Sequence, residues 1–397
     1  MVAFRPRADG RRALGLRVLR KLASDFLIAT GSGGADDSYY RSLHGQLTLV
    51  PMPGFEAQAR DVKRRIEEHG YKAGKPRIKV DIAYPKFGFH NELEPWIDMN
   101  GIHVCGHDCV VVASGPGTPK MIIQLELLLN QLMGRKAERI SIALQYFPWS
   151  RSDKPEIDRR FALIRFMVDK LHNAAGTKGL HRLWVCDPHS SQMPAVDKSG
   201  KITPILLTGR LSTHVITEAL KTGKRVCAAL PDKGAEASFW EPLSQVEELV
   251  GYSIPRVVGQ KRRIDANTTI LESIQGDLDA VPDSVVIAFD DETRTLGSIC
   301  GMGAMLRAKY KATTVWAAVT HGILGKDALE RMTDPDCPIN RTFMMNTIPI
   351  NHRQKLYGLP ELDYVIEQGL LTPISWNPDL ADIIRLGHLG RNTRGLQ

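Results

Sequence analysis

Short apolar runs and amphipathic segments alternate along most of the 397-residue chain. The run VVIAF at 285–289 is apolar at every position, which is typical of a strand covered on both faces. Apolar residues then recur at helical spacing, at Ile299, Met302, Met305 and Leu306. This pattern predicts β–α units on a mostly parallel sheet, which defines the α/β class.

The same alternation occurs in two successive halves of the chain. Strands are predicted at 109–113, 139–145, 183–186, 225–230, 285–289 and 314–319. Helices are predicted at 120–133, 161–172, 211–220, 243–250 and 298–310. Prolines interrupt residues 41–85, where a helix at 56–68 and a strand at 77–82 are expected. We therefore expect two α/β domains, with a boundary near the polar, glycine-containing segment 197–203.

Composition and charge narrow the possible classes of protein. The formal charge is +8, but the basic residues are scattered and form no array with aromatic residues, so we expect no nucleic-acid partner. Binding of anionic nucleotides and sugar phosphates accounts for the excess of basic residues equally well. No apolar run approaches the roughly 18 residues that cross a bilayer, so no membrane-spanning role is expected. The basic segment 1–25 is expected to be an extension or an added helix; an organellar presequence is the alternative, which Asp9 and Gly10 fit poorly.

The six cysteines show no disulfide-like framework, which favours a reducing, cytoplasmic setting. In HVCGHDC, the residues His103, Cys105, His107 and Cys109 suggest a zinc cluster. They alternate at every second position, however, as one face of an extended segment does, and such positions rarely enclose a tetrahedral metal without a second pair of ligands. We expect a strand with its preceding turn here.

The polar turn after the 285–289 strand has the layout of a ribose-phosphate-binding loop. A helix begins there, and its amino terminus offers unpaired N–H groups and positive dipole to an anion. Gly297 lets the backbone approach a phosphate, and Thr295 and Ser298 add hydroxyl donors. Asp290 and Asp291 can accept hydrogen bonds from sugar hydroxyls or hold water around Mg²⁺. The turn predicts a phosphorylated sugar as ligand; a site for a metal alone is the alternative.

Two other polar segments follow predicted strands in the first half. In YFPWSRSDK, Arg151 and Lys154 could neutralise a triphosphate, with Trp149 or Phe147 against a base. A basic surface loop is the alternative. In CDPHSSQMP, His189 could bind a metal or the charged end of a nucleotide, or it could be a structural histidine.

Two more candidates lie in the second half. In LPDKGAE, Asp232 follows the 225–230 strand, where an aspartate is in most folds a helix cap or a turn residue. GQKRRIDAN at 259–267 is a short positive run, and such runs are usually solvated faces.

Taken in order, these segments resemble those of one enzyme family. FDDETRTLGSI resembles the phosphoribosyl-diphosphate (PRPP) loop of type I phosphoribosyltransferases and, with its neighbours, that of the ribose-phosphate diphosphokinases, or PRPP synthetases. YFPWSRSDK is similar to the family's YFPYARQDR-like segment, CDPHSSQMP to DLHAxQ, LPDKGAE to SPDxG, and GQKRRIDAN to a KRR-containing flexible loop. The resemblance extends from about residue 25 to the end, with additions at 41–85 and 325–342.

The resemblance implies an architecture and a reaction. Two tandem phosphoribosyltransferase-type (Rossmann-like) domains are expected at 26–200 and 201–377, with a carboxyl-terminal helix at 378–397 packed on the first. The implied reaction is Mg²⁺-dependent transfer of the β,γ-diphosphoryl group of ATP to the anomeric hydroxyl of ribose 5-phosphate, giving PRPP and AMP. A homo-oligomer is also implied.

The resemblance also implies roles for individual residues. The expected catalytic residues are Lys261, Arg263 and His189, with His189 and Asp232 near the metal. The expected ATP-binding residues are Arg151, Asp153, Phe87, Phe89 and Glu92, the last three from KFGFHNE at 86–92. The expected ribose-phosphate-binding residues are Asp290, Asp291, Thr295, Leu296, Gly297 and Ser298.

One departure from the family pattern changes the expected charge beside the sugar. The loop of relatives reads like DDMxDTxGT, whereas Arg294 occupies the place of the third aspartate and Ser298 that of the last threonine. Arg294 either turns outward or meets an additional anion. Two alternatives follow: a diphosphokinase for another ribosyl phosphate, or a non-catalytic regulatory homologue. Joint retention of Lys261, Arg263 and His189 with Asp232 argues against the regulatory alternative.

Overall fold

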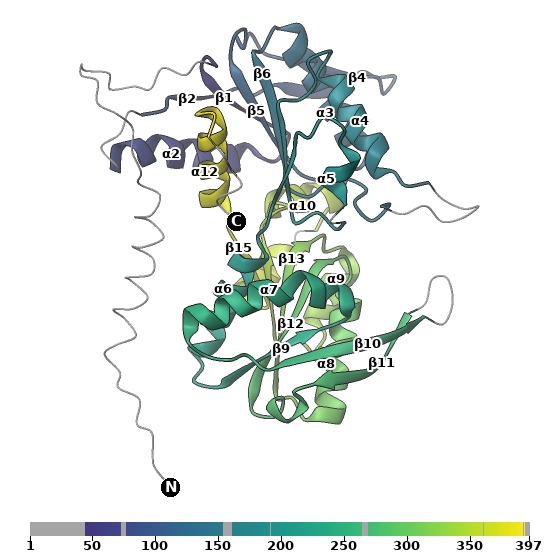
Figure 1. Cartoon of the computed structure of the whole chain (residues 1–397). Helices are drawn as coiled ribbons and strands as arrows, with labels where there is room; N and C mark the ends of the chain where they lie inside the picture. Colours follow the sequence, from purple (N-terminus) through teal and green to yellow (C-terminus); the bar gives the residue numbers. More distant parts are fainter. Residues whose placement is uncertain are drawn as a thin grey trace. The chain divides into compact units, whose positions relative to one another are not determined.

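The computed structural model describes residues 44–72, 77–153, 161–190, 192–263, 269–359, 361–391 and 393. The expected extension at 1–25 and Lys154 lie outside these residues. The described residues form two sheets flanked by helices, together with a separate two-stranded hairpin (Figure 1). The predicted α/β class is confirmed.

The first sheet is parallel throughout and has the order β2-β1-β5-β6-β7-β8. Its strands are β1 Leu47–Pro51, β2 Val80–Ile82, β5 Asp108–Ala113, β6 Arg139–Leu144, β7 Arg182–Cys186 and β8 Ile202–Ile205. The helices are α2 Glu56–Lys72, α3 Pro119–Gly134, α4 Ile164–Ala174 and α5 Met193–Val196. Strands β1 and β5 are buried at every position, because helices cover both faces of the sheet. The antiparallel hairpin consists of β3 Lys86–Phe89 and β4 Pro95–Asp98.

The second sheet has the order β11-β10-β9-β12-β13-β14-β15 and is parallel except for the β10–β11 pair. Its strands are β9 Arg225–Leu230, β10 Arg256–Arg263, β11 Thr269–Gly276, β12 Ser284–Thr293, β13 Thr314–Gly322, β14 Arg341–Met345 and β15 Leu371–Ile374. The helices are α6 Thr208–Leu220, α7 Lys233–Val250, α8 Gly297–Tyr310, α9 Lys326–Thr333, α10 Ile350–Tyr357, α11 Glu361–Glu367 and α12 Asn377–His388, with a short 3₁₀ turn at Leu278–Ala280.

Three local predictions in the second half of the chain differ most from the structure, and in the first half the helix predicted from 161 begins at Ile164 and the strand predicted from 77 begins at Val80. Helix α7 begins at Lys233, ten residues before the predicted start, because Asp232 caps it and Pro242 is accommodated inside it. Strand β12 continues to Thr293, so Asp290 and Asp291 lie in the strand rather than in the turn. The positive run at 261–263 ends strand β10 instead of lying in a loop.

The last helix returns to the first sheet after the chain has completed the second. Helix α12 packs against α2, and Nε2 of Gln58 in α2 donates to Oδ1 of Asn377 in α12 at 2.9 Å. Trp376, just before α12, is 1% exposed and donates its indole N–H to Oε1 of Gln145 at 2.7 Å. The sheets span 47–205 and 225–374, while the predicted domain limits stay a prediction.

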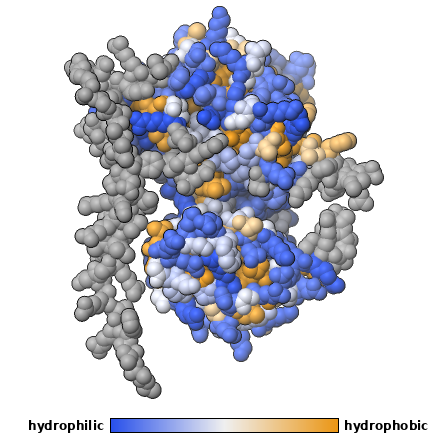
Figure 2. All heavy atoms as spheres, viewed as in Figure 1, coloured by the Kyte–Doolittle hydropathy of each residue, from blue (hydrophilic) through white to orange (hydrophobic). Residues whose placement is uncertain are grey.

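The visible face of the molecule is mostly hydrophilic, with separate apolar patches (Figure 2). In the described part of the chain, no helix combines the length and the apolar character needed to cross a membrane.

Candidate functional site

Polar residues follow strand ends in both sheets, at β7 in the first and at β9 and β12 in the second. The carboxyl ends of parallel strands are where α/β folds usually place their ligand sites. His189 lies just beyond β7, and Asp291 lies near the end of β12. The Nδ1 atom of His189 is 2.8 Å from Oδ2 of Asp291, so the loop after β7 of the first sheet meets strand β12 of the second sheet at this contact.

The His189–Asp291 pair is ionised at neutral pH. The hydrogen bond to Asp291 raises the pKa of His189 to about 9, with partial burial opposing the rise and the charges of Asp291, Glu292 and Asp153 adding to it. Burial disfavours the ionised form of Asp291, but the hydrogen bond and the charge of His189 outweigh it and lower the pKa of Asp291. His189 is therefore an imidazolium cation at the junction of the two sheets.

A second ion pair, between Asp232 and Lys261, acts electrostatically on Asp290. Oδ1 of Asp232 caps helix α7 by accepting from the N–H groups of Gly234 at 2.9 Å and Ala235 at 3.0 Å. Its Oδ2 accepts from Nζ of Lys261 at 2.5 Å. Burial first, and then the charges of Asp291 and Asp232, raise the pKa of Asp290 well above its ordinary value. Asp290 therefore favours its protonated form beside the two ionised carboxylates of Asp291 and Asp232.

The predicted cationic clamp is described only in part. Lys261 lies on β10, which pairs with β11 in an antiparallel hairpin and has an irregular register between Gln260 and Lys261. Arg263 is the last residue of β10, but its side chain lies outside the described part of the structure, as do residues 264–268. The lysine therefore approaches Asp232 from a strand rather than from a free loop.

The predicted phosphate loop is a tight turn between β12 and α8. Leu296 takes the left-handed conformation, with a φ of 61°, and its N–H donates to Oγ1 of Thr293 at 2.9 Å. The Gly297 N–H, expected to face a phosphate, donates to Oγ1 of Thr295 at 3.3 Å. A Cβ atom added at Gly297 would lie only 2.9 Å from Nη1 of Arg331, so glycine allows the close approach here. Ser298 is exposed in the first turn of α8.

The structure adds Glu292 and Tyr146 to the site, and sequence reasoning missed both. Glu292 is buried and bonds to Nε of Arg151, while its other oxygen accepts from the Tyr146 hydroxyl at 3.1 Å. The arginine predicted to contact ATP is therefore held by a carboxylate of β12, the strand that carries the predicted ribose-phosphate-binding residues. One feature of the sequence could have pointed to Glu292: in the family pattern DDMxDTxGT, this acidic residue occupies the place of the methionine.

Arg294 lies in a cavity of about 420 Å³ beside the loop. Arg151, Lys326 and Asp327 also line this cavity, and Trp149 contributes its aromatic wall. Glu292 holds Arg151, and Glu330 lies 3.6 Å from Lys326. The guanidinium of Arg294 makes no hydrogen bond or ion pair with any residue that the structure describes. The cavity thus offers an unneutralised cation next to the predicted sugar-phosphate site.

The predicted adenine-side residues lie on the β3–β4 hairpin. Phe87 is partly buried and packs against the hydrophobic core. The ring centre of Phe89 lies 5.3 Å from Nζ of Lys120. Glu92 is exposed in the turn of the hairpin. Within the described part of the chain, no hydrogen bond or ion pair joins them to the His189–Asp291 pair. Asp153, by contrast, lies close enough to raise the pKa of His189.

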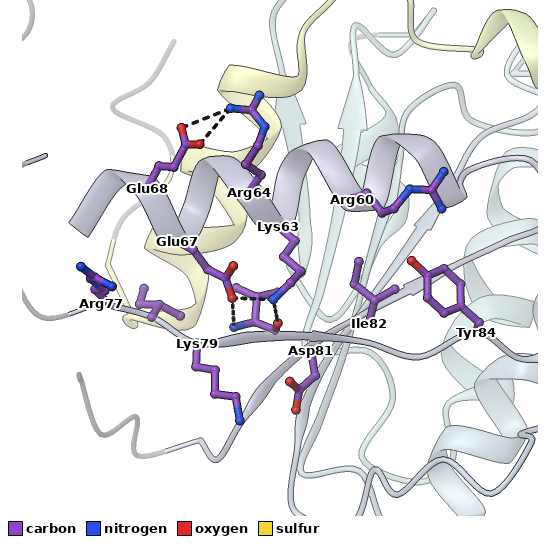
Figure 3. Close-up of a pocket in the computed structure, with 12 residues that line it drawn as sticks. Arg60, Lys63, Arg64, Glu67, Glu68, Arg77, Lys79, Asp81, Ile82 and Tyr84 are labelled. Carbon is purple, nitrogen blue, oxygen red and sulfur yellow. Dashed lines mark hydrogen bonds and ion pairs between the residues drawn. The ribbon is translucent and has the colours of Figure 1, made fainter. Parts of the chain in front are cut away.

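A larger cavity, of about 940 Å³, lies between α2 and the edge strand β2 (Figure 3). Lys63 bonds there to Glu67 at 2.5 Å and to the backbone carbonyl of Val80, and Arg60 and Tyr84 line the far end. None of the predicted site residues contributes to this cavity. Its size alone does not make it the functional site.

The fold is that of two successive phosphoribosyltransferase-type α/β units. Among solved structures, the chain is similar to the phosphoribosylpyrophosphate synthetase of Mycobacterium smegmatis, with a TM-score of 0.65 and 21% sequence identity over 86% of this chain and 99% of that one. At this identity, the likeness establishes the fold. No family model matches the chain.

Curated relatives point to one group within this type. The ribose-phosphate pyrophosphokinase of Rhodopirellula baltica is 27% identical over 65% of this chain and 77% of its own length. The ribose-phosphate pyrophosphokinase of Clostridium acetobutylicum is also 27% identical, over 70% of this chain and 82% of its own length. The chloroplastic ribose-phosphate pyrophosphokinase 1 of Oryza sativa is 24% identical over 69% of this chain and 63% of its own length. The chain is a divergent relative of the ribose-phosphate pyrophosphokinases.

Proposed function

We propose that this protein transfers the β,γ-diphosphoryl group of ATP to the anomeric hydroxyl of ribose 5-phosphate, forming PRPP and AMP. The observation that carries the proposal is the junction of His189 with Asp291. It brings the polar end of β7, a predicted ATP-side segment, against the predicted ribose-phosphate strand β12. A two-substrate reaction needs such a junction, because both substrates must be held within reach of each other.

In this proposal the protein positions charges around the reacting phosphates. Lys261 and the His189 imidazolium offset negative charge on the transferred group, and Arg263 adds to them. Asp290 and Asp291 accept hydrogen bonds from the ribose hydroxyls. The turn from Thr295 to Ser298 receives the 5-phosphate, the group that helix amino termini bind well. We expect Arg151 and Asp153 on the ATP side, with Phe87, Phe89 and Glu92 around the base, and assembly into a homo-oligomer.

The donors present fit Mg²⁺. Burial first, and then the negative charges of Asp291 and Asp232, raise the pKa of Asp290, and a divalent cation beside Asp290 and Asp232 would offset both effects. In the described part of the chain, no group of three or more Asp, Glu, His or Cys side chains is placed to hold a metal ion. Mg²⁺ usually takes one or two carboxylates together with substrate phosphates, whose charge it offsets. We assign His189 the role of a cation in the site, since the hydrogen bond to Asp291 raises its pKa to about 9.

A second candidate acceptor is a ribosyl phosphate that carries a further anionic group. The unneutralised guanidinium of Arg294, at the wall of the 420 Å³ cavity, favours it. Arginine forms strong, directional pairs with phosphate and carboxylate, and a free arginine beside the sugar site would select such an acceptor.

The test is to incubate the protein with Mg²⁺, ATP and ribose 5-phosphate and to follow AMP and PRPP by phosphorus NMR. We expect both products in equal amounts. Absence of AMP above background contradicts the first candidate, and AMP formed only with a doubly anionic ribosyl acceptor supports the second. Lys261→Ala should lower turnover by about a hundredfold or more, the usual cost of losing a group that stabilises developing charge.

The matched control is the neighbouring Arg262→Ala. Arg262 is 64% exposed and lies 3.7 Å from Glu272 on the adjacent strand, so its loss should leave turnover close to that of the wild type. Circular dichroism checks that both variants fold. Wild-type turnover in the Lys261 variant would remove the lysine from the proposed clamp.

A further inference from the structure

Helix α8, which begins at the ribose-phosphate loop, packs against the segment after α9. Nε of Arg307 donates to the Pro338 carbonyl at 2.8 Å. A Cβ atom added at Gly303 would lie 2.9 Å from Cδ1 of Ile339, so the helix and this segment are in close contact. Residues three and four positions apart share one face of a helix, so Cys300 lies on the same face as Gly303 and Arg307.

The Cys300 thiol meets the thiol of Cys337 at this contact. Both side chains are partly buried and pack against the same apolar cluster, and each thiol shifts the pKa of the other. The hydrogen bond from Cys300, together with the charge of Arg307, holds the pKa of Cys337 below its ordinary value, with partial burial and Asp334 opposing. A thiol of lowered pKa that remains partly accessible has the properties of a reactive cysteine.

The pair lies next to the proposed ribose-phosphate loop. The N–H of Cys300 donates to the carbonyl of Leu296 at 2.8 Å, which places Cys300 in the first turn of α8. From α9, Nη1 of Arg331 donates to the carbonyl of Thr295 at 3.0 Å. Helix α9, which leads into the segment that carries Cys337, therefore contacts the same turn at which α8 and Cys300 begin.

We propose that Cys300 and Cys337 form a reversible disulfide by exchange with a small-molecule or protein disulfide. The Cys337 thiolate attacks one sulfur of that disulfide and expels the other as a thiolate, leaving a mixed disulfide on Cys337. The Cys300 thiol then loses its proton, and its sulfur attacks the Cys337 sulfur and releases the second thiolate. Two electrons and two protons pass from the cysteine pair to the oxidant, which ends as two thiols.

The disulfide weakens binding of ribose 5-phosphate, a consequence that rests on the proposed function. A disulfide requires the sulfur atoms to approach to about 2.05 Å, much closer than hydrogen-bonded thiols. Closing this gap pulls the first turn of α8 toward Cys337 and displaces the turn at Thr295–Ser298. The oxidised protein therefore has a several-fold higher KM for ribose 5-phosphate, which dithiothreitol restores.

The chemical test is to treat the full-length protein with oxidised glutathione, block free thiols with N-ethylmaleimide and map tryptic peptides by mass spectrometry. Residues 295–307 and 332–341 form separate tryptic peptides, each with a single cysteine. We expect one linked species that lacks two hydrogens relative to the separate peptides, absent in Cys337→Ser and present in the control Cys105→Ser, whose cysteine is exposed. Two alkylated peptides, or a link from Cys337 to another cysteine, would overturn the proposal.

The functional test compares the KM for ribose 5-phosphate in oxidised and reduced protein. Cys337→Ser should keep the reduced value under both conditions. A linked species without a change in KM overturns the regulatory part. If the reduced protein forms no AMP, the proposed function fails, and the peptide map still decides whether the disulfide forms.

Discussion

His189 retains a proton that an ordinary histidine would release near neutral pH. Its pKa of about 9 depends first on the hydrogen bond to Asp291. Because the folded-state pKa lies above the ordinary value near 6.5, the pair stabilises the protein fully below pH about 6.5. That contribution is lost as the pH rises from there through about 9. The same proton gives the site its cation, so we expect substrate binding to weaken over the same alkaline range.

Asp291→Asn should return the pKa of His189 toward its ordinary value. The amide keeps a hydrogen-bond acceptor but removes the negative charge that favours the imidazolium. NMR titration of the histidine ring signals, assigned with His189→Gln, measures the shift. Asp153→Asn is the matched control, since Asp153 has the smallest of the named effects on His189. If His189 in Asp291→Asn titrates as in the wild type, another group sets its charge.

At the level of single residues, the sequence indicated most of the polar groups that the structure brings together. Asp290 and Asp291 could be predicted because they follow an apolar run, whereas His189 and Asp232 were indicated by the resemblance of their segments to those of the family. The bond between Glu292 and Arg151 could not be predicted, since its partners are separated by 141 positions and belong to different sheets. Local pattern carries no information on such a pair, whose partners meet only when the two sheets pack.

Helix α7 depends on its cap at the level of the element. Asp232 accepts from two N–H groups of the first turn, which would otherwise have no partner within the helix. Asp232→Ala should lower the free energy of unfolding by about 0.5–2 kcal/mol, whereas Asp232→Ser, which keeps a capping oxygen, should lose much less. The ion pair with Lys261 adds little to this difference, because Asp232 is 37% exposed and both variants lose the pair.

Urea unfolding followed by circular dichroism measures these two variants. Equal destabilisation by alanine and serine would mean that the carboxylate charge, and not the cap, supports the start of α7. A larger loss in the serine variant than in the alanine variant would contradict both accounts.

Helices and strands with a clear pattern of apolar residues were predicted well. Those in which proline or charged residues interrupt that pattern were not. The strand at 225–230 matches β9, because its last five residues are buried without interruption. The first half of α7 was missed, since Pro242 and a polar surface hid its period. The β10–β11 hairpin was missed because QKRR reads as a charged loop, although in the structure it pairs with β11 along its length.

At the scale of the whole molecule, buried polar contacts join the two sheets. These contacts cannot be predicted from the local pattern of apolar and polar residues. His321 at the end of β13 lies 3.0 Å from the Cys186 carbonyl at the end of β7, and its other ring nitrogen lies 2.9 Å from Oγ1 of Thr347. Burial lowers the pKa of His321. The contribution of the neutral ring is therefore present above the ordinary histidine pKa and is lost as the pH falls through the folded-state value.

The return of the chain to the first sheet is anchored at Trp376. Its ring is 1% exposed, and its N–H donates to Gln145, which also accepts from Gln58 at 3.1 Å. Trp376→Ala should lower the free energy of unfolding by about 3–5 kcal/mol, because it leaves a large cavity where α12 meets the sheet. Trp376→Phe should cost about 1 kcal/mol through the lost hydrogen bond, since Gln145 keeps its bond to Gln58.

Trp240 provides the matched control for this anchor. It is 51% exposed and packs beneath the guanidinium of Arg256, 4.2 Å from its ring centre. Trp240→Ala should therefore cost about 1 kcal/mol or less, the value of an exposed cation–π contact. The urea concentration at the midpoint of unfolding, measured by circular dichroism, is compared among the three variants. If Trp376→Ala unfolds at the same midpoint as Trp240→Ala, α12 contributes no more than a surface contact, and the first sheet is stable without the returning chain.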